Sequence, residues 1–421
     1  MSTKRNDIKE IFKASLLNTI AHRRARRFPL GCTIPDQELH YVSEKPPVPL
    51  NDLELAMLCW AGNGVTGTIT GDLPISGGNL FTSWLGRAAP YACNVHNTRL
   101  FYTGDPGTYI YHPETATRTV EVESEDDWET ILAAYHQGCQ KVLDERAEFV
   151  PKSLLRAMHW NTNQPGTTIF IPVVDLTMEY IDLLLGIFDF EGHGYQLFDD
   201  RQGKWAGLGD LIDADKLKGP RVDLSSFEQN LLTLSLAPAY MMLENIHLLA
   251  EAMGLGSVVF GGYTGTVMLG VTSQSKGLGF RAATDKAGKT NAVGLDGVFE
   301  AFCPPYYRDM DEAVEAFVEM KFGSGGLFSA DYRGKVAFKN WGEIQPKYHH
   351  PSRQSINQVK AVCRHVYETY GRFPASYDTK MIPIWLQVHH LELDFYKAHY
   401  PPEMVTEAQR QHMALWHQEE Q

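Results

Sequence analysis

The chain of 421 residues carries 38 Lys and Arg against 51 Asp and Glu, which gives a formal net charge of -13. Hydrophobic residues make up 43% and charged residues 21%, as in ordinary globular proteins, and the length suggests about two or three units or one elaborated domain. The acidic balance argues against a nucleic-acid partner for the whole surface, because binding phosphates requires a positive field.

The N-terminal region predicts a helix over residues 5–22, with Ile8, Ile11 and Phe12 on one apolar stripe. The first fifteen residues are charged throughout and lack an apolar stretch, so we expect no signal peptide. The six cysteines are scattered and form no C-x-x-C pair, which is typical of reduced thiols in a cytoplasmic protein. No apolar run of 18 residues occurs, and we expect no membrane span.

The next region predicts one helix, one loop and one hairpin. Asn51 can cap a helix over residues 53–59. Residues 62–79 are rich in Gly, Thr and Ser and predict a loop. Strands over residues 98–102 and 108–111 are joined by TGDPG, where Pro presets one backbone angle and Gly permits a positive φ.

The rest of the chain mixes helices and strands. A β-branched strand is predicted over residues 168–174. Helices are predicted over residues 126–149, 227–253 and 311–322, and a helix or long apolar segment over residues 178–188. The elements follow no βαβ rhythm, which favours an α+β fold over a doubly wound sheet.

Two glycine-containing stretches match nucleotide-binding motifs only in part. The sequence AGKT at residues 287–290 ends like a P-loop, but Ala283 replaces the required Gly and no apolar strand precedes it. Gly277, Gly279 and Ala282 fit G-x-G-x-x-A after a polar segment rather than a strand. The chain also lacks the G-x-S-x-G and H-E-x-x-H motifs. We therefore predict no NTPase, Rossmann, serine hydrolase or zincin site.

The C-terminal stretch VHHLELDFY offers a candidate metal site. His390 and Asp394 are four residues apart, which places them on one face of a helix. Further candidate ligands are His389, Glu392, His349 and His350. The alternative is that these residues pack an amphipathic helix whose polar tips are hydrogen-bonded, and the spacing leaves both interpretations open.

The run HRRARRF at residues 22–28 places four arginines within five residues of an acidic protein. It is either a solvated basic face or an anion site, since guanidinium groups suit phosphate.

A second unusual stretch is GLGSVVFGGY, residues 254–263, in which four glycines surround a short apolar run. Gly254 and Gly256 can end the preceding helix and turn the chain. Gly261 and Gly262 can let a ligand approach the backbone, because no Cβ stands in the way.

Three segments in this order resemble the FMN-dependent nitroreductase superfamily, especially its longer members related to the azoline-forming dehydrogenases. They are HRRARRF, LPISGGNLF at residues 73–81 and AYMMLENIHLLAEAMGLGSVVFGGY at residues 239–263. The resemblance covers roughly residues 10–320. It implies a nitroreductase-like α+β fold with a central, mostly antiparallel sheet flanked by helices. The implied flavin domain spans 1–345, with an insertion over 145–225 and a mostly helical C-terminal extension over 346–421.

The resemblance also implies three groups of flavin contacts: the phosphate and ribityl chain, a loop beside the ribityl and ring, and backbone near N5. In that order the residues are Arg23, Arg24 and Arg26; Ser76, Gly77 and Asn79; and Gly261 and Gly262. Arg24 stands where the family commonly has Ser. The family also supplies a late cation to the phosphate, for which Arg281, Arg333, Lys335 and Lys339 are candidates.

The activity implied is that of an FMN-dependent oxidoreductase, which passes hydride from NAD(P)H to flavin N5 and on to a small-molecule acceptor. No side chain need act as acid or base in this scheme. The implied assembly is a homodimer with FMN between the subunits, without nucleic acid or membrane. Two alternatives remain open: a non-redox binding module that keeps the fold with an empty pocket, and a His/Asp metal enzyme centred on the C-terminal segment.

Overall fold

The structure is a computed structural model that describes most of the chain. The described residues are 6–35, 38–75, 78–91, 95–113, 124–149, 158–190, 196–207, 220–324, 326 and 350–417, and for residues 6, 68–75, 78–85, 125 and 189–190 the backbone alone. Within these ranges, no helix combines the length and apolar character needed to span a bilayer.

A seven-stranded sheet forms the centre of the molecule, with the order β12-β17-β8-β5-β6-β7 and with β16 beside β8. Its strands are β5 (Thr98–Gly104), β6 (Gly107–Tyr111), β7 (Cys139–Leu143), β8 (Thr167–Asp175), β12 (Gly256–Phe260), β16 (Lys380–Met381) and β17 (Trp385–His389). Every pairing in this sheet is antiparallel.

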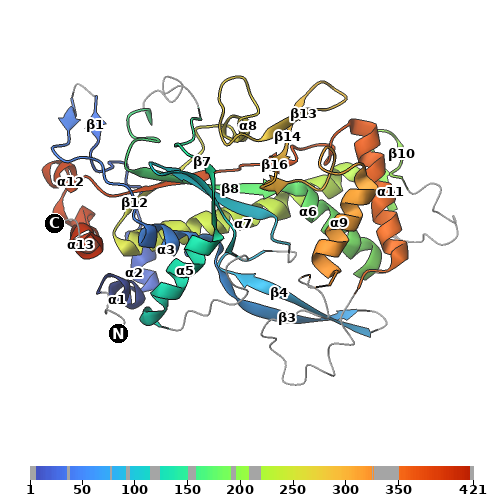
Figure 1. Ribbon diagram of the computed structural model, residues 1–421, viewed down its shortest axis with the longest axis horizontal. Coiled ribbons are helices and arrows are strands. Elements are labelled where there is room, and N and C mark those ends of the chain that lie inside the picture. Colours follow the sequence, from blue (N-terminus) through green and yellow to red (C-terminus); the bar gives the residue numbers. More distant parts are fainter. Residues whose placement is uncertain are drawn as a thin grey trace.

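Helices surround this sheet (Figure 1). They are α1 (Asn6–Lys13), α2 (Leu16–His22), α3 (Asp52–Asn63), α5 (Trp128–Gly138), α6 (Leu176–Leu185), α7 (Leu224–Met253), α8 (Gly265–Leu269), α9 (Met310–Phe322), α11 (Arg353–Tyr370), α12 (Leu393–His399) and α13 (Glu407–Trp416). Short helical turns are η1 (Glu125–Asp127), η3 (Gly186–Phe190) and η5 (Pro402–Met404). The predicted α+β class, with a central antiparallel sheet flanked by helices, is confirmed.

Smaller sheets lie around the central one. They comprise β1 (Thr33–Ile34) with β2 (Tyr41–Val42), β3 (Val65–Ile75) with β4 (Gly78–Arg87), β9 (Gln196–Asp199) with β10 (Lys204–Trp205) and β11 (Arg221–Asp223), and β13 (Arg281–Thr284) with β14 (Thr290–Leu295) and β15 (Phe299–Glu300).

The period-two alternation of the strands sends successive side chains into different cores. On one face, Leu100 and Phe170 pack with residues of α3 and α7. On the other face, Phe101 and Ile169 pack with residues of β12, α8 and β14. Because β8 is buried along its whole length, its sequence TTIFIPVVD is almost uninterruptedly apolar or β-branched.

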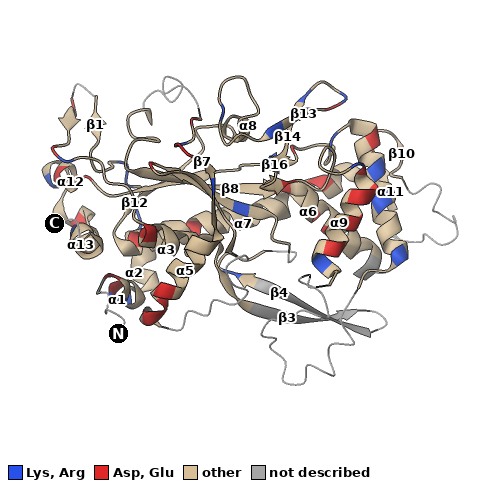
Figure 2. Ribbon diagram, in the orientation of Figure 1, with Lys and Arg blue, Asp and Glu red and all other residues tan. Residues whose placement is uncertain are grey.

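A third core joins α6, α9, α11 and the first half of α7 at one end of the molecule. Figure 2 shows acidic and basic residues intermixed on α9 and α11. Lys360 pairs there with Glu315, and Arg364 pairs with Asp311, which ties the two helices together.

Several predicted elements are confirmed. The capping box of Asn51 and Glu54 starts α3, and the TGDPG hairpin forms β5 and β6. The long helix is α7, and Gly254 ends it with a φ of 88°.

Three predicted elements differ. The helix over residues 5–22 breaks at Ser15, whose hydroxyl accepts from Asn18 N and caps α2. The loop over residues 62–79 belongs largely to the β3–β4 hairpin, since its Thr and Ile residues favour strands. The helix over residues 126–149 ends at Gly138, and the chain continues as β7.

The central sheet takes β8 from the range 145–225 and β17 from the range 346–421. Neither range is therefore peripheral to the fold. The sheet requires both, because β17 lies between β12 and β8 and is buried along its length.

Candidate functional site

The arginine run lies in an extended segment beside β12. Arg26 N donates to Ser257 O at 3.0 Å. Further along, Leu30 N donates to His390 O at 2.8 Å, and Glu392 N donates to Phe28 O at 2.9 Å. The first bond holds Arg26 against β12, the strand that leads directly to Gly261, and the other two bonds join the following residues to the chain after β17.

Arg23 and Arg24 lie where α2 ends. Arg23 Nε is 3.7 Å from Glu244 Oε1, on the solvent side of α7. The Arg24 side chain is exposed and donates to the carbonyl oxygens of Ala21 at 3.1 Å and Arg23 at 2.8 Å. Because carbonyl groups carry no formal charge, these two bonds leave the Arg24 charge available to an anion.

Arg26 is buried, at 4% exposure, and its guanidinium lies 5.8 Å from the ring centroid of Tyr396. Within the described part of the chain, its Nε has no hydrogen-bond partner. Burial raises the pKa of the neighbouring Glu251, and the charge of Arg26 offsets part of that rise. The next residue, Arg27, was not predicted as a contact, yet its guanidinium lies 5.9 Å from the ring centroid of Phe260.

The four glycines of residues 254–262 fall into two groups. A Cβ on Gly254, whose φ is 88°, would lie 2.3 Å from Ala408 O, and a Cβ on Gly256 would lie 2.5 Å from Leu391. Gly261 and Gly262 are exposed and neither has a positive φ. A Cβ on Gly261 would meet nothing within 4 Å. The fold thus requires the first pair, whereas neither backbone angle nor packing requires Gly261.

The second group of predicted contacts, beside the ribityl chain and ring, is described only at Asn79. Ser76 and Gly77 lie outside the described residues. Asn79 belongs to β4 opposite Pro74. Figure 1 shows the β3–β4 hairpin apart from α2, at the other side of the view.

The predicted pairing of His390 with Asp394 does not form, because β17 ends at His389 and α12 begins only at Leu393. Asp394 pairs instead with Lys45 Nζ at 2.7 Å on the surface. His389 is buried in β17, and burial lowers its pKa to about 3.

Other predicted ligands are also dispersed. His349 lies outside the described residues, and Glu392 Oε2 accepts from Gly31 N at 3.2 Å. His390 turns inward, where its Nε2 is 3.0 Å from Oε1 of Glu54. No local sequence pattern indicates this contact, since the two residues are 336 positions apart.

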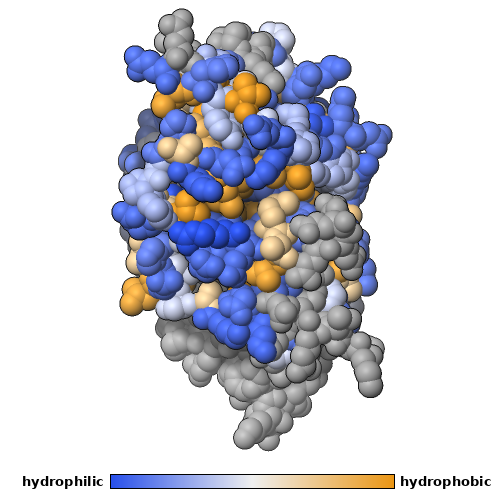
Figure 3. Space-filling model, turned by 90° about the vertical axis from the view of Figure 1, so that its left-hand side faces the viewer, coloured by the Kyte–Doolittle hydropathy of each residue, from blue (hydrophilic) through white to orange (hydrophobic). Residues whose placement is uncertain are grey.

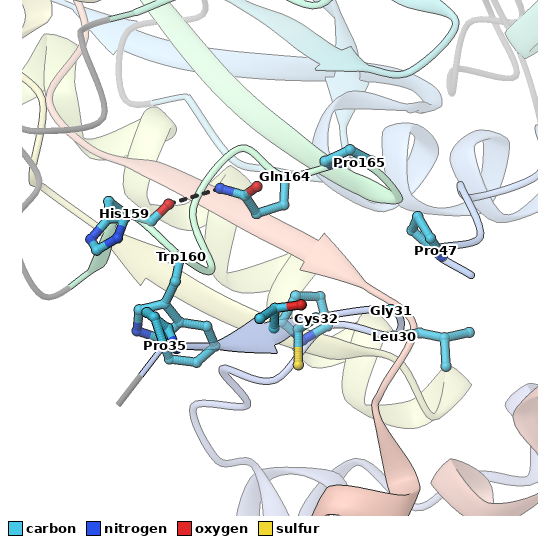
Figure 4. Close-up of a pocket in the computed structure, with 11 residues that line it drawn as sticks. Leu30, Gly31, Cys32, Pro35, Pro47, His159, Trp160, Gln164 and Pro165 are labelled. Atoms are coloured by element: carbon cyan, nitrogen blue, oxygen red, sulfur yellow. Dashed lines mark hydrogen bonds between the residues drawn. The ribbon is translucent and has the colours of Figure 1, made fainter. Parts of the chain in front are cut away.

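A cavity of about 330 Å³ follows the arginine run in the chain (Figure 4). Its lining residues are Pro29, Leu30, Gly31, Cys32, Thr33, Pro35, Pro47, His159, Trp160, Gln164 and Pro165. The volume matches the lower end of small-molecule sites. Arg23, Arg24, Arg26, Gly261 and Gly262, the predicted flavin contacts that the structure describes in full, do not line it.

Most residues that line this cavity have apolar side chains. Among the polar ones, Gln164 Nε2 donates to His159 O at 2.8 Å, as Figure 4 shows. Burial raises the pKa of the Cys32 thiol to about 12, so this thiol stays protonated and is not a nucleophile near neutral pH.

Comparisons with known proteins leave the family open. No family model matches the chain, and no curated protein matches it. Among solved structures it is similar to one described as a "putative nitroreductase" from Ralstonia eutropha JMP134. The two are 18% identical, and the match covers 60% of this chain and 72% of that chain with a TM-score of 0.27. A TM-score this low supports no conclusion about the function of this chain.

Proposed function

We propose that this chain is an FMN-dependent oxidoreductase of nitroreductase type, which transfers hydride between NAD(P)H and a small-molecule acceptor. The observation that carries the proposal is Gly261. It is exposed, has no positive φ and would clash with nothing as Ala. Because neither backbone angle nor packing explains this glycine, the remaining physical reason is that a ligand approaches the backbone closely.

The donor groups nearby fit a phosphorylated ring system. The exposed Arg24 guanidinium donates to two carbonyl oxygens, and Arg26 has an Nε without a hydrogen-bond partner in the described residues. Arg26 is bonded to β12 through its backbone, and β12 ends one residue before Gly261. Basic donors and side-chain-free backbone therefore occur along one strand.

The roles of this chain's residues follow from that arrangement. The arginines would hold the phosphate, because guanidinium groups form charge-assisted bonds to its oxygens. The backbone at Gly261 and Gly262 would lie against the ring and exclude water from that side. FMN, when bound, supplies the hydride-transfer chemistry, and no side chain of this chain is assigned as a catalytic acid or base.

The proposed site needs a second copy of the chain. Asn79 lies in a hairpin that is apart from α2 within one chain, as Figure 1 shows. A partner's hairpin could supply the loop beside the flavin. Exposed apolar side chains on α2 and the adjoining α7 offer a surface for such a homodimer: Leu16, Leu17, Ile20, Tyr240 and Met241.

Absorbance of the purified full-length protein tests the proposal. We expect a yellow protein with a band at about 450 nm, or a colourless protein that keeps this band after incubation with FMN and removal of the unbound cofactor by gel filtration. Arg24→Glu should weaken FMN binding by about 100-fold, because it places a carboxylate beside the phosphate.

Arg308→Glu is the matched control. Arg308 is an exposed arginine paired with Asp309 at 3.0 Å, remote in sequence from α2 and β12. It should leave FMN affinity unchanged. A protein that neither contains nor binds FMN would favour the non-redox binding module, and equal affinity in Arg24→Glu and wild type would refute the phosphate assignment.

A further inference from the structure

Four buried side chains from distant parts of the chain converge on one point. Glu54 comes from α3, His390 follows β17, and His412 and His417 lie in and just after α13. Oε1 of Glu54 is 3.0, 2.8 and 3.2 Å from Nε2 of His390, His412 and His417 in turn. None of the four side chains is more than 6% exposed.

The outer nitrogens of two rings fix which atom faces the centre. His390 Nδ1 is 2.9 Å from Val48 O, and His412 Nδ1 is 2.8 Å from Met253 O. A carbonyl only accepts, so each Nδ1 carries a proton. In a neutral ring, Nε2 then presents a lone pair to the centre, which is the arrangement of metal-bound histidines with carbonyl partners.

Glu54 is oriented in the same way. Its Oε2 accepts from Asn51 N at 2.7 Å in the cap of α3, which leaves Oε1 for the centre. A carboxylate oxygen offers about two lone-pair sites, yet three imidazole nitrogens lie within hydrogen-bond distance of Oε1. If all three Nε2 atoms carried protons, these protons would crowd one oxygen, whereas a cation would use one lone pair from each ligand.

We propose that Glu54, His390, His412 and His417 bind one divalent transition metal, and that this metal is zinc. Three imidazoles and a carboxylate are a typical donor set for zinc. Ligand atoms of a tetrahedral zinc site are separated by roughly 3.3 Å, as follows from bond lengths near 2.0 Å. The His390 and His417 nitrogens are 3.2 Å apart, and all four ligand atoms lie within 4.8 Å of one another.

The site has a structural role. Four protein ligands fill a tetrahedral shell, and their burial leaves no open position for substrate. The metal joins α13 to α3 and to the chain after β17. Through the bond from His412 to Met253 O, it also holds the end of α7 that leads into β12.

The side of the molecule that carries α12 and α13 exposes mostly hydrophilic residues with small apolar groups between them (Figure 3).

Metal analysis of the purified full-length protein tests this inference. We expect about one zinc per chain, or its uptake when zinc is added to chelator-treated protein. Removal of the metal should lower the thermal midpoint by roughly 5–10 °C, and added zinc should restore it. Cobalt added instead should give the intense visible bands of a tetrahedral site.

The variants His412→Ala and His417→Gln should each lower zinc affinity by about 100-fold or more, and the second keeps the test available if the first fails to fold. His365→Ala is the matched control, since His365 pairs with Asp199 at 2.8 Å in another buried His–carboxylate contact. It should retain zinc.

Wild-type protein that contains no metal and shows no change in thermal midpoint with added zinc would overturn the proposal. Glu54 and the three histidines would then form a hydrogen-bonded cluster without a metal. Zinc retained at full affinity by both ligand variants would overturn it as well. Flavin content is measured separately, so that a protein with zinc but no FMN contradicts only the proposed function, and the reverse result contradicts only the metal site.

Discussion

Among single residues, His247 is a buried residue of α7 that lies beside the arginine segment. Its Nδ1 lies 3.5 Å from an Arg23 guanidinium nitrogen and 3.8 Å from Glu244 Oε2. Burial, followed by the charge of Arg23, lowers the pKa of His247 from 6.5 to about 4. This histidine is therefore neutral in the folded protein near neutral pH.

The lowered pKa predicts an acid-sensitive contribution to stability. Between about 6.5 and about 4, the unfolded chain binds a proton that the folded chain does not. The free energy of unfolding should therefore fall as the pH falls through this window, by at most about 3 kcal/mol from this residue. Urea unfolding of wild type and His247→Gln at about pH 7 and about pH 5 measures it.

The variant should lose less stability than wild type between the two pH values, because glutamine does not titrate. Carboxylates titrate in both proteins. The difference between wild type and variant in how steeply the free energy of unfolding changes with pH therefore reports His247 alone. An equal change of unfolding free energy with pH in both proteins would mean that His247 does not titrate in this window.

A second residue-scale prediction concerns the ion pair of Lys380 and Asp175, in which both side chains are fully buried and Nζ to Oδ2 is 2.7 Å. Lys380→Met leaves the Asp175 charge without its partner and should cost about 3–5 kcal/mol of unfolding free energy. The double variant Lys380→Met with Asp175→Asn should be more stable than Lys380→Met alone. Urea denaturation checks both, and a double variant no better than the single one would contradict this explanation.

Among the elements, the end of α7 depends on Gly254. Gly254→Ala combines a φ of 88° with a Cβ only 2.3 Å from Ala408 O of α13. We expect a loss of at least about 2 kcal/mol in urea unfolding, because backbone strain and a steric clash add together. Gly288→Ala is the control: its φ is 79°, but its Cβ would meet nothing within 4 Å. It should cost about 1 kcal/mol from strain alone, and an equal loss in both variants would rule out the clash.

The elements also show where local sequence signals succeed and fail. The α3 helix and the β5–β6 hairpin were predicted because their capping and turn residues act within a few positions of one another. The β3–β4 hairpin differs from the predicted loop because the Thr and Ile residues between the glycines favour strands. The helix that ends at Gly138 was predicted too long, because Gly138 lies close to His112 O, a contact that only the folded chain makes.

At the scale of the whole molecule, the proposed flavin site predicts a homodimer through α2 and α7. Leu17 is 76% exposed and Ile20 is 50% exposed on α2. Leu17→Glu with Ile20→Glu should convert a dimer into a monomer, since charged side chains at an apolar interface lose their hydration. Light scattering coupled to gel filtration measures the mass.

Val42→Glu is the matched control for that prediction, because Val42 is 56% exposed on β2, away from α2 and α7 in the chain. It should leave the dimer intact. A monomeric wild-type protein would contradict the prediction and also the need for a partner's hairpin in the flavin site.

The sequence alone determined the α+β class, the major helices and the glycine turn that ends α7, since caps, periodicity and turn residues act over short distances. It also identified the arginines and the glycines as candidate ligand contacts, but it did not show that Arg26 is buried. Only the tertiary structure placed β17 between β12 and β8 and brought Glu54 to three histidines more than 300 positions later. Such contacts leave no local pattern, because they exist only after the sheet has joined distant parts of the chain.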